Sequence, residues 1–152
     1  ALLSKACDAG NAVACGRHAL LLYGARGGER DYAGARQYET RACEGGAFIR
    51  CDPAGTAWMW DQAGPADFVR GRHLFQLGCS ERVEYQQSCL KLGMAYHRGD
   101  GGPQDDGAAR KVLARACKLG FPPACEAAKD PVVLDRYTEQ QDEEAKAGKT
   151  AK

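Results

Sequence analysis

The sequence lacks the features of several functional classes. None of the apolar runs in its 152 residues approaches the roughly 20 residues that a helix needs to span a bilayer. The net charge is only +1, whereas a general binder of nucleic acid or anionic membranes needs a basic excess. Aromatic residues make up 8%, and hydrophobic residues 44%. We therefore expect a soluble globular protein with no nucleic-acid partner and no membrane span.

The signatures of metal and cofactor sites are also missing. The chain has three histidines, His18, His73 and His97, and no His-x-x-x-His pair. It contains no Cys-x-x-Cys, the close spacing that structural zinc sites usually use. We predict no metal and no cofactor, and we expect His18 to be a core or groove residue.

The sequence does contain eight regularly spaced cysteines. The first cysteines of four pairs fall at positions 7, 43, 79 and 117, and the second ones at 15, 51, 89 and 125. The steps are 36 residues, except that a two-residue insertion within the third pair lengthens one step of each series to 38. Self-similarity at this period is typical of a solenoid, in which one supersecondary unit stacks on the next.

The second helix of each unit is predicted to begin at an acidic residue twelve positions before a first cysteine. Asp31, Asp67 and Asp105 hold this position, and aspartate is a favoured N-cap. Small residues then recur at helical spacing, and an arginine recurs next to the first of them. We interpret that arginine column as a solvated rim. The small residues and the arginines are Ala35, Ala42, Gly71, Gly78, Ala109 and Ala116, and Arg36, Arg72 and Arg110.

The first helix of each unit is predicted to run through the second cysteine. At one position of the repeat the residue is small in every unit, which suits the close approach of another helix. At a second position the residue is large in every unit, which suits a core side chain. A glycine, the residue that best tolerates the left-handed conformation, ends the preceding helix in three turns. These columns are Ala19, Gly55 and Gly93 (small), Leu22, Trp58 and Tyr96 (large), and Gly10, Gly46 and Gly120 (turn).

The third unit carries a family resemblance. Residues 92–101, LGMAYHRGDG, followed by an acidic cap and by residues 116–120, ACKLG, resemble the Sel-one-like repeat, a relative of the tetratricopeptide repeat. With a cysteine pair in every unit, the chain is most similar to the cysteine-rich branch, the Helicobacter cysteine-rich proteins. The resemblance covers about residues 1–128, and the second unit departs from it at Pro53, Met59 and Trp60.

This resemblance implies a fold and a kind of function. The fold is an all-α, right-handed superhelix of helix-turn-helix repeats, each about 36 residues long. The function is a protein- or peptide-binding scaffold or adaptor of a bacterial secreted or periplasmic system, with an immunity-like role as one variant. The partner is an unknown protein or peptide, and we expect a monomer.

The even, paired spacing of the cysteines favours disulfides over free buried thiols or structural zinc. The two helices that flank each turn form an antiparallel hairpin, which brings both cysteines of a pair within reach of each other. We predict that each pair closes its own turn and that the protein works in an oxidising compartment. The predicted disulfides are Cys7–Cys15, Cys43–Cys51, Cys79–Cys89 and Cys117–Cys125.

We predict one repeat domain over residues 1–137 and a polar, flexible tail over 138–152. Counting back 36 residues from Tyr38 reaches Leu2, so the chain is expected to start in the middle of a repeat. Pro131 should end the helix that contains Cys125 near Lys129. Asp130 and Pro131 should then start a closing helix. Its short apolar face is Val133, Leu134 and Tyr137.

One alternative function is a hydrolase. Ser88-Cys89-Leu90-Lys91 matches the Ser-x-x-Lys string of penicillin-recognising enzymes, and members of the resembled branch suggest a penicillin-binding protein or a hydrolase of β-lactams or cell-wall peptides. The Ser-Asp-Asn and Lys-Thr-Gly partners are missing from the sequence. We interpret the string as a coincidence and assign no catalytic residue.

The predicted binding surface is the concave side, which the first helices line in superhelices of this type. Trp60 draws attention because its equivalents are Gly24 and Arg98, so the position does not require a buried aromatic residue. It is either a binding anchor or a filler of space beside the altered loop at 61–66. The predicted binding residues are Arg17, Leu20, Tyr23, Met59, Trp60, Lys91, Met94, His97 and Arg98.

Overall fold

The computed structural model describes residues 2–24, 29–60, 63–80 and 82–136, together with residues 143 and 147. Within this part of the chain the regular structure is helical, and the one β-type pairing is an isolated bridge between Cys79 and Glu84. The elements are α1 (Leu2–Asp8), α2 (Ala12–Gly24), α3 (Tyr32–Glu44), the 3-10 helix η1 (Phe48–Arg50), α4 (Cys51–Met59), α5 (Phe68–Gly78), α6 (Gln86–Arg98), α7 (Asp106–Lys118) and α8 (Pro122–Lys129).

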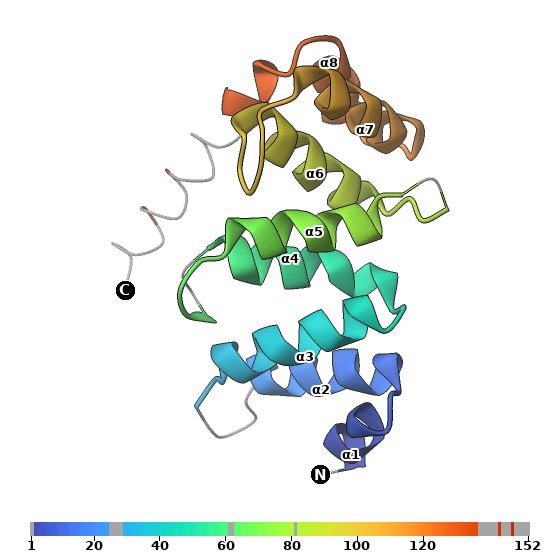
Figure 1. The fold of residues 1–152 in the computed structure, drawn as a ribbon, viewed down its shortest axis with the longest axis vertical. Coiled ribbons are helices and arrows are strands. Elements are labelled where there is room, and N and C mark those ends of the chain that lie inside the picture. The colour runs from blue at the N-terminus through green and yellow to red at the C-terminus, as the bar shows by residue number, and fades with distance from the viewer. Residues whose placement is uncertain are drawn as a thin grey trace.

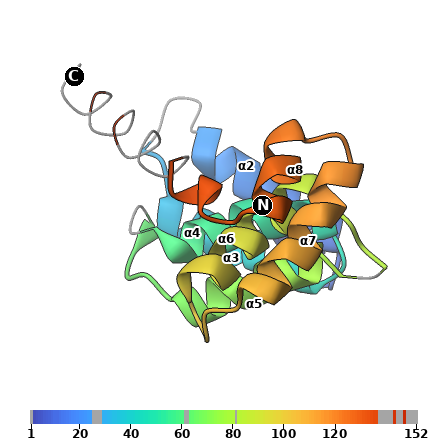
Figure 2. The ribbon, with the colours of Figure 1, turned by 90° about the horizontal axis from the view of Figure 1, so that it is seen from above.

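The helices form a right-handed α/α solenoid, as predicted. Helix α2 packs on α3, α4 on α5, α6 on α7 and α7 on α8. Figure 1 shows these pairs stacked along the long axis, with α1 and α8 at opposite ends. Seen from the α8 end, α2 and α5 lie on opposite sides of the stack (Figure 2). First helices therefore form one layer of the solenoid and second helices the other.

All four predicted disulfides are confirmed. Each closes the turn between two consecutive helices, with Cα atoms 4.7 or 4.8 Å apart, and no free cysteine remains. This spacing lies within the range that disulfide geometry allows. Four disulfides indicate an oxidising, extracytoplasmic compartment.

The three aspartate caps are also confirmed. The side chains of Asp31, Asp67 and Asp105 accept hydrogen bonds from the third backbone N–H of the helices that follow them. The predicted turn glycines have positive φ angles, 91° at Gly10 and 102° at Gly46, which other residues rarely adopt. Local sequence signals therefore set both ends of each second helix.

The small residues at fixed positions of the repeat let the two layers of helices approach closely. A Cβ atom on Gly55 would lie 2.5 Å from the Phe75 ring, and one on Gly93 would lie 2.5 Å from Cγ of Leu113. Such distances are shorter than van der Waals contact, so these positions exclude every side chain larger than hydrogen. Phe75 and Leu113 are themselves fully buried and belong to the main core.

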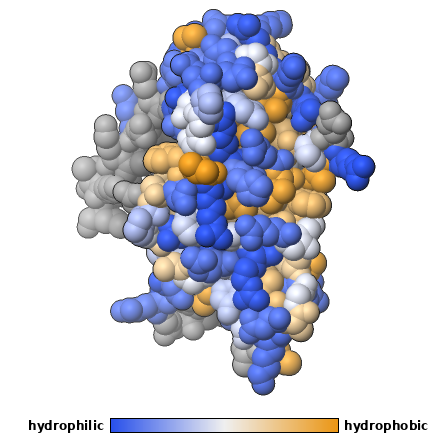
Figure 3. Space-filling model, in the orientation of Figure 1, coloured by the Kyte–Doolittle hydropathy of each residue, from blue (hydrophilic) through white to orange (hydrophobic). Residues whose placement is uncertain are grey.

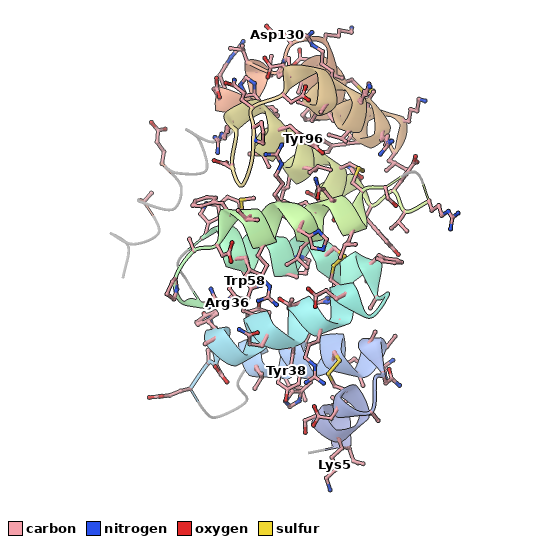
Figure 4. The ribbon with its side chains drawn as sticks, in the orientation of Figure 1. Lys5, Arg36, Tyr38, Trp58, Tyr96 and Asp130 are labelled. Atoms are coloured by element: carbon pink, nitrogen blue, oxygen red, sulfur yellow. A yellow bond between two sulfur atoms is a disulfide. The ribbon has the colours of Figure 1, made fainter. Side chains whose placement is uncertain are left out.

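The arginine column is not the predicted solvated rim, because two of its three members are buried between units. Arg36 lies 3.9 Å from the centre of the Trp58 ring in the next unit and donates to the Pro65 carbonyl at 2.9 Å. The two side chains meet where α3 joins the α4–α5 pair (Figure 4). A guanidinium group combines a flat face for stacking with several N–H donors, and a buried position uses both.

The next unit repeats this contact. Arg72 lies 4.3 Å from the Tyr96 ring centre, and it donates to the Pro103 carbonyl at 3.0 Å and to the Asp100 carbonyl. Arg110 differs: it is exposed, and the residue in sequence register with the aromatic residues is Val132, which lies beyond the end of α8. The prediction of a rim therefore holds for Arg110 alone.

The C-terminal elements agree with the predicted stop. Helix α8 ends at Lys129, Pro131 is buried, and the Asp130 side chain accepts from the Val132 N–H at 3.2 Å. Residues 133–136 are helical, and Leu134 packs into the main core with 1% of its surface exposed. Tyr137 and the predicted tail, apart from residues 143 and 147, lie outside the described residues.

The second unit differs from the others at both ends of its first helix. A 3-10 turn, η1, precedes α4, and α4 ends at Met59, so that Trp60 has an extended conformation. Two large apolar side chains at the start of α5, Phe68 and Val69, are exposed. On the face of the molecule that Figure 3 shows, hydrophobic side chains gather over the middle, at the level of α5.

The aspartate caps should contribute to stability. We expect Asp31→Ala and Asp105→Ala each to lower the free energy of unfolding by about 1 kcal/mol, because a helix N–H loses its acceptor. Urea unfolding would measure the change. Wild-type stability in both variants would contradict the assigned helix starts.

Arg72 and Arg110 provide a matched pair for the buried contact. Arg72→Met should lower the free energy of unfolding by about 1–3 kcal/mol, because it leaves two carbonyl groups without their donor and removes the stacking on Tyr96. Arg110→Met, at the exposed position, should stay within about 0.5 kcal/mol of wild type. Equal losses in the two variants would show that the stacking contributes nothing.

Candidate functional site

A groove of about 850 Å³ runs along the layer of first helices. Apolar and aromatic side chains predominate in it, with charged groups from several elements among them. This composition is typical of surfaces that bind ligands or protein segments. The lining residues are Leu20, Tyr23, Tyr32, Glu39, Arg50, Pro53, Thr56, Ala57, Met59, Trp60, Ala63, Phe68, Phe75, Lys91, Met94, Ala95, Arg98 and Asp100.

The structure brings seven of the nine predicted binding residues to this groove. Met59 is buried, whereas the other six are exposed or half-buried. Arg17 is exposed on α2 but does not line the groove, and His97 is buried elsewhere. The seven are Leu20, Tyr23, Met59, Trp60, Lys91, Met94 and Arg98.

Trp60 lies at the edge of the groove with 41% of its surface exposed. The Lys91 ammonium lies 5.9 Å from the centre of its ring. Lys91 is fixed by two further contacts, an ion pair with Asp52 at 2.8 Å and a hydrogen bond to the Thr56 hydroxyl at 2.6 Å. An exposed indole beside a positioned cation offers both an apolar face and a charge to a bound segment.

A buried ion pair that sequence reasoning missed forms another part of the groove wall. Glu39 of α3 is fully buried, and Arg50 of η1 donates to both of its carboxylate oxygens, with 2.7 Å between Nε and Oε2. Arg50 reaches it across Gly16, where a Cβ atom would lie 3.1 Å from Cγ of Arg50. The bidentate geometry is the strongest that a carboxylate and a guanidinium can form.

The sequence contained a signal for this pair. The repeat places Glu39 in one column with Phe75 and Leu113, and both of these are core residues. A lone acidic residue in a buried apolar column requires a partner, because an isolated buried charge is very costly. Arg50 occupies a second position of the repeat at which the other units have buried residues, Ala14 and Ser88.

This end of the groove also has perturbed acidities. Burial raises the pKa of Glu39 above its ordinary value, and the hydrogen bond from Arg50 and its charge oppose the change. Burial also raises the pKa of Tyr23, and the nearby Glu39 carboxylate adds to the increase. The Tyr23 and Tyr32 rings lie 6.0 Å apart. The groove thus has an aromatic, partly desolvated end at α2 and α3 and a cationic end at α6.

His97 joins three elements outside the groove. Its Nδ1 lies 2.7 Å from Oδ1 of Asp106 at the start of α7, and its Nε2 lies 3.4 Å from Oδ1 of Asp135. Burial lowers the pKa of His97, but hydrogen bonds to the two carboxylates and their charges outweigh it and raise the pKa above its ordinary value. These contacts explain structurally why this polar side chain is buried.

The Ser-x-x-Lys string does not form a catalytic pair. Ser88 is fully buried against Gly78, so a substrate has no access to its hydroxyl. The Lys91 ammonium contacts Asp52 and Thr56 instead. Cys89 between them is bonded to Cys79. The arrangement therefore gives no support to the hydrolase alternative.

The structure also bears on metals and membranes, within the residues it describes. In that part of the chain, no three His, Cys, Asp or Glu side chains gather in a way that could hold a metal ion. None of the helices described there has the length and apolar character needed to cross a bilayer.

Three solved structures share this fold. A protective antigen of uropathogenic Escherichia coli with an SLR fold has a TM-score of 0.68 and 20% identity over 81% of this chain, which spans 26% of that chain. A Sel1 repeat protein from Oxalobacter formigenes has a TM-score of 0.70 and 19% identity over 84% of this chain and 95% of that one. Helicobacter pylori cysteine-rich protein B has a TM-score of 0.60 and 23% identity over 82% and 88%.

These likenesses confirm the predicted fold. At such low identity they show the Sel1-type solenoid and not an activity. No protein-family model matches the sequence, and a search of curated proteins found no match.

The contacts of His97 predict a pH dependence of stability. Because its pKa is higher in the folded state than the unfolded value of about 6.5, its contribution is fully present below that pH and is lost as pH rises through the folded pKa. His97→Asn should remove this part of the pH dependence in urea unfolding at a series of pH values. His73→Asn, at an exposed histidine, is the control and should keep it. An unchanged pH profile in His97→Asn would contradict the assignment.

Proposed function

We propose that the protein is a scaffold that binds a segment of a partner protein in the groove between its first helices. The observation that carries the proposal is Trp60, which is 41% exposed, lies beside Lys91 and lines the groove together with Met59 and Met94. Exposed tryptophan and arginine residues dominate the energetics of protein interfaces. Methionine side chains adapt to irregular partner surfaces.

The charges of the first helices favour an acidic segment. Residues 12–24, 48–60 and 86–98 contain four arginine or lysine residues and one carboxylate, Asp52. Lys91 pairs with Asp52, and Arg50 pairs with the buried Glu39. The exposed Arg98 and the half-buried Asp100 also line the groove, and the exposed Arg17 lies on α2 outside it. The proposed partner segment thus has a large apolar side chain for the Trp60 end and an acidic group for Arg98.

The oxidising compartment adds a cellular setting for the proposal. A scaffold with this many disulfides suits a bacterial secreted or periplasmic system, in which an adaptor or immunity-like role would hold another exported protein. The protein is proposed to act as a monomer, because one chain provides the whole groove.

The experiment selects peptides from a random displayed library on the immobilised protein and measures their affinity by calorimetry. Trp60→Ala should weaken binding by about 2 kcal/mol, or roughly 30-fold, at unchanged melting temperature. Arg98→Ala should weaken acidic peptides and reduce the salt dependence of binding. Tyr85→Ala is the matched control, because it removes a similarly exposed aromatic residue, 40% exposed, that does not line the groove.

Two outcomes would contradict the proposal. Selected peptides that bind Trp60→Ala and wild type equally would place the binding site elsewhere. A lower melting temperature of Trp60→Ala with unchanged affinity would instead make Trp60 a packing residue of the loop that follows α4.

A further inference from the structure

The four disulfides differ in their access to solvent. Six of the cysteines are buried, with exposed fractions between 0% and 4%. Cys117 and Cys125 are both partly exposed. Thiol–disulfide exchange requires a thiolate to reach one of the two sulfur atoms, so access controls its rate in a folded protein.

We propose that Cys117–Cys125 is a site of thiol–disulfide exchange. A dithiol reductant opens it in the folded protein, and the opening releases the C-terminal segment 119–136 from the stack. This site is independent of the groove, because neither cysteine lines it.

The exchange occurs in two steps. A thiolate of the dithiol attacks Sγ of Cys117, the S–S bond breaks, and Cys125 leaves as a thiolate that takes up a proton from water. The second thiol of the reductant, as its thiolate, then attacks the mixed disulfide and releases Cys117, which is protonated in turn. The reductant becomes a disulfide and gives two electrons to the cystine.

Cys125 is the better leaving group, because it lies in the first turn of α8, where the positive end of the helix stabilises a thiolate. This property is not what distinguishes the fourth turn. Cys15, Cys51 and Cys89 also lie in the first turns of their helices, α2, α4 and α6. The distinguishing feature is therefore the partial exposure of both cysteines.

Helix α8, which the cystine ties to α7, has few other attachments of its own. Helix α8 is eight residues long, packs mainly on α7, and has no side-chain N-cap. Its buried side chains are the small ones of Ala124 and Ala127; after α8, Pro131 and Leu134 are buried and Asp135 contacts His97. By contrast, α4 in the second unit packs against α3, α5 and α6. Loss of the cystine removes a larger share of what holds α8 in place.

The first test is timed reduction of the folded protein with dithiothreitol, alkylation with iodoacetamide, and peptide mapping. Cys117 and Cys125 should be alkylated about tenfold faster or more than the other six cysteines, which react only after local opening. The difference should vanish in concentrated guanidinium chloride, where every sulfur is accessible. Equal rates in the folded protein, or another pair opening first, would overturn the proposal.

The second test is hydrogen exchange of the singly reduced, alkylated protein. Exchange should rise across residues 119–136 and stay at the wild-type level in α2 to α5. The double variant Cys117→Ala/Cys125→Ala should show the same local increase without an alkyl group. Cys43→Ala/Cys51→Ala is the matched control, and its exchange should rise around α3 and α4 instead. Wild-type protection of 119–136 in both the alkylated protein and the Cys117→Ala/Cys125→Ala variant would overturn the release.

Discussion

The cystine-closed turn between consecutive helices is the constraint on which the rest of the structure depends. It holds the Cα atoms of the two cysteines less than 5 Å apart, so the helices on either side must pass close to each other. The residue just before the first cysteine is small in all four turns, and it is buried in three of them, at Ala42, Gly78 and Ala116. A Cβ atom on Gly78 would lie 2.9 Å from Cβ of Cys51 in the neighbouring turn. The turn thus sets how closely two successive units approach, and its small residue lets the neighbouring turn pack against it.

Polar contacts then join the units to each other. Arg36 stacks on Trp58, and the indole N–H donates to the Thr40 hydroxyl at 2.7 Å, so α3 and α4 share a hydrogen-bonded seam. Arg50 extends this seam to Glu39. Buried polar groups are costly when a partner is missing, so a shifted register between units would leave several of them unsatisfied. They therefore favour one stacking arrangement over its neighbours.

The features predicted correctly from sequence are those that depend on a single position of the repeat. Cysteine spacing gave the disulfides, the aspartates gave the helix starts, and Gly55 and Gly93 marked the close approaches. The burial of Arg36 and Arg72 was missed because it depends on two columns, an arginine and an aromatic residue one unit later. Most of the groove followed from helical register, since its columns face one side of the stack. His97 did not, because its partner Asp135 belongs to the closing segment, where the repeat has ended.

The placement of the cystines has a mechanical consequence. Each one closes a loop inside a single helix-turn-helix, and none links residues on opposite sides of a loop between α2 and α3, α4 and α5, or α6 and α7. Successive units are therefore cross-linked covalently at each turn, while the two helices of one unit are held against each other by noncovalent packing. Under load the stack would lengthen in steps as the two helices of a unit separate, while the few residues inside each cystine-closed loop bear no force.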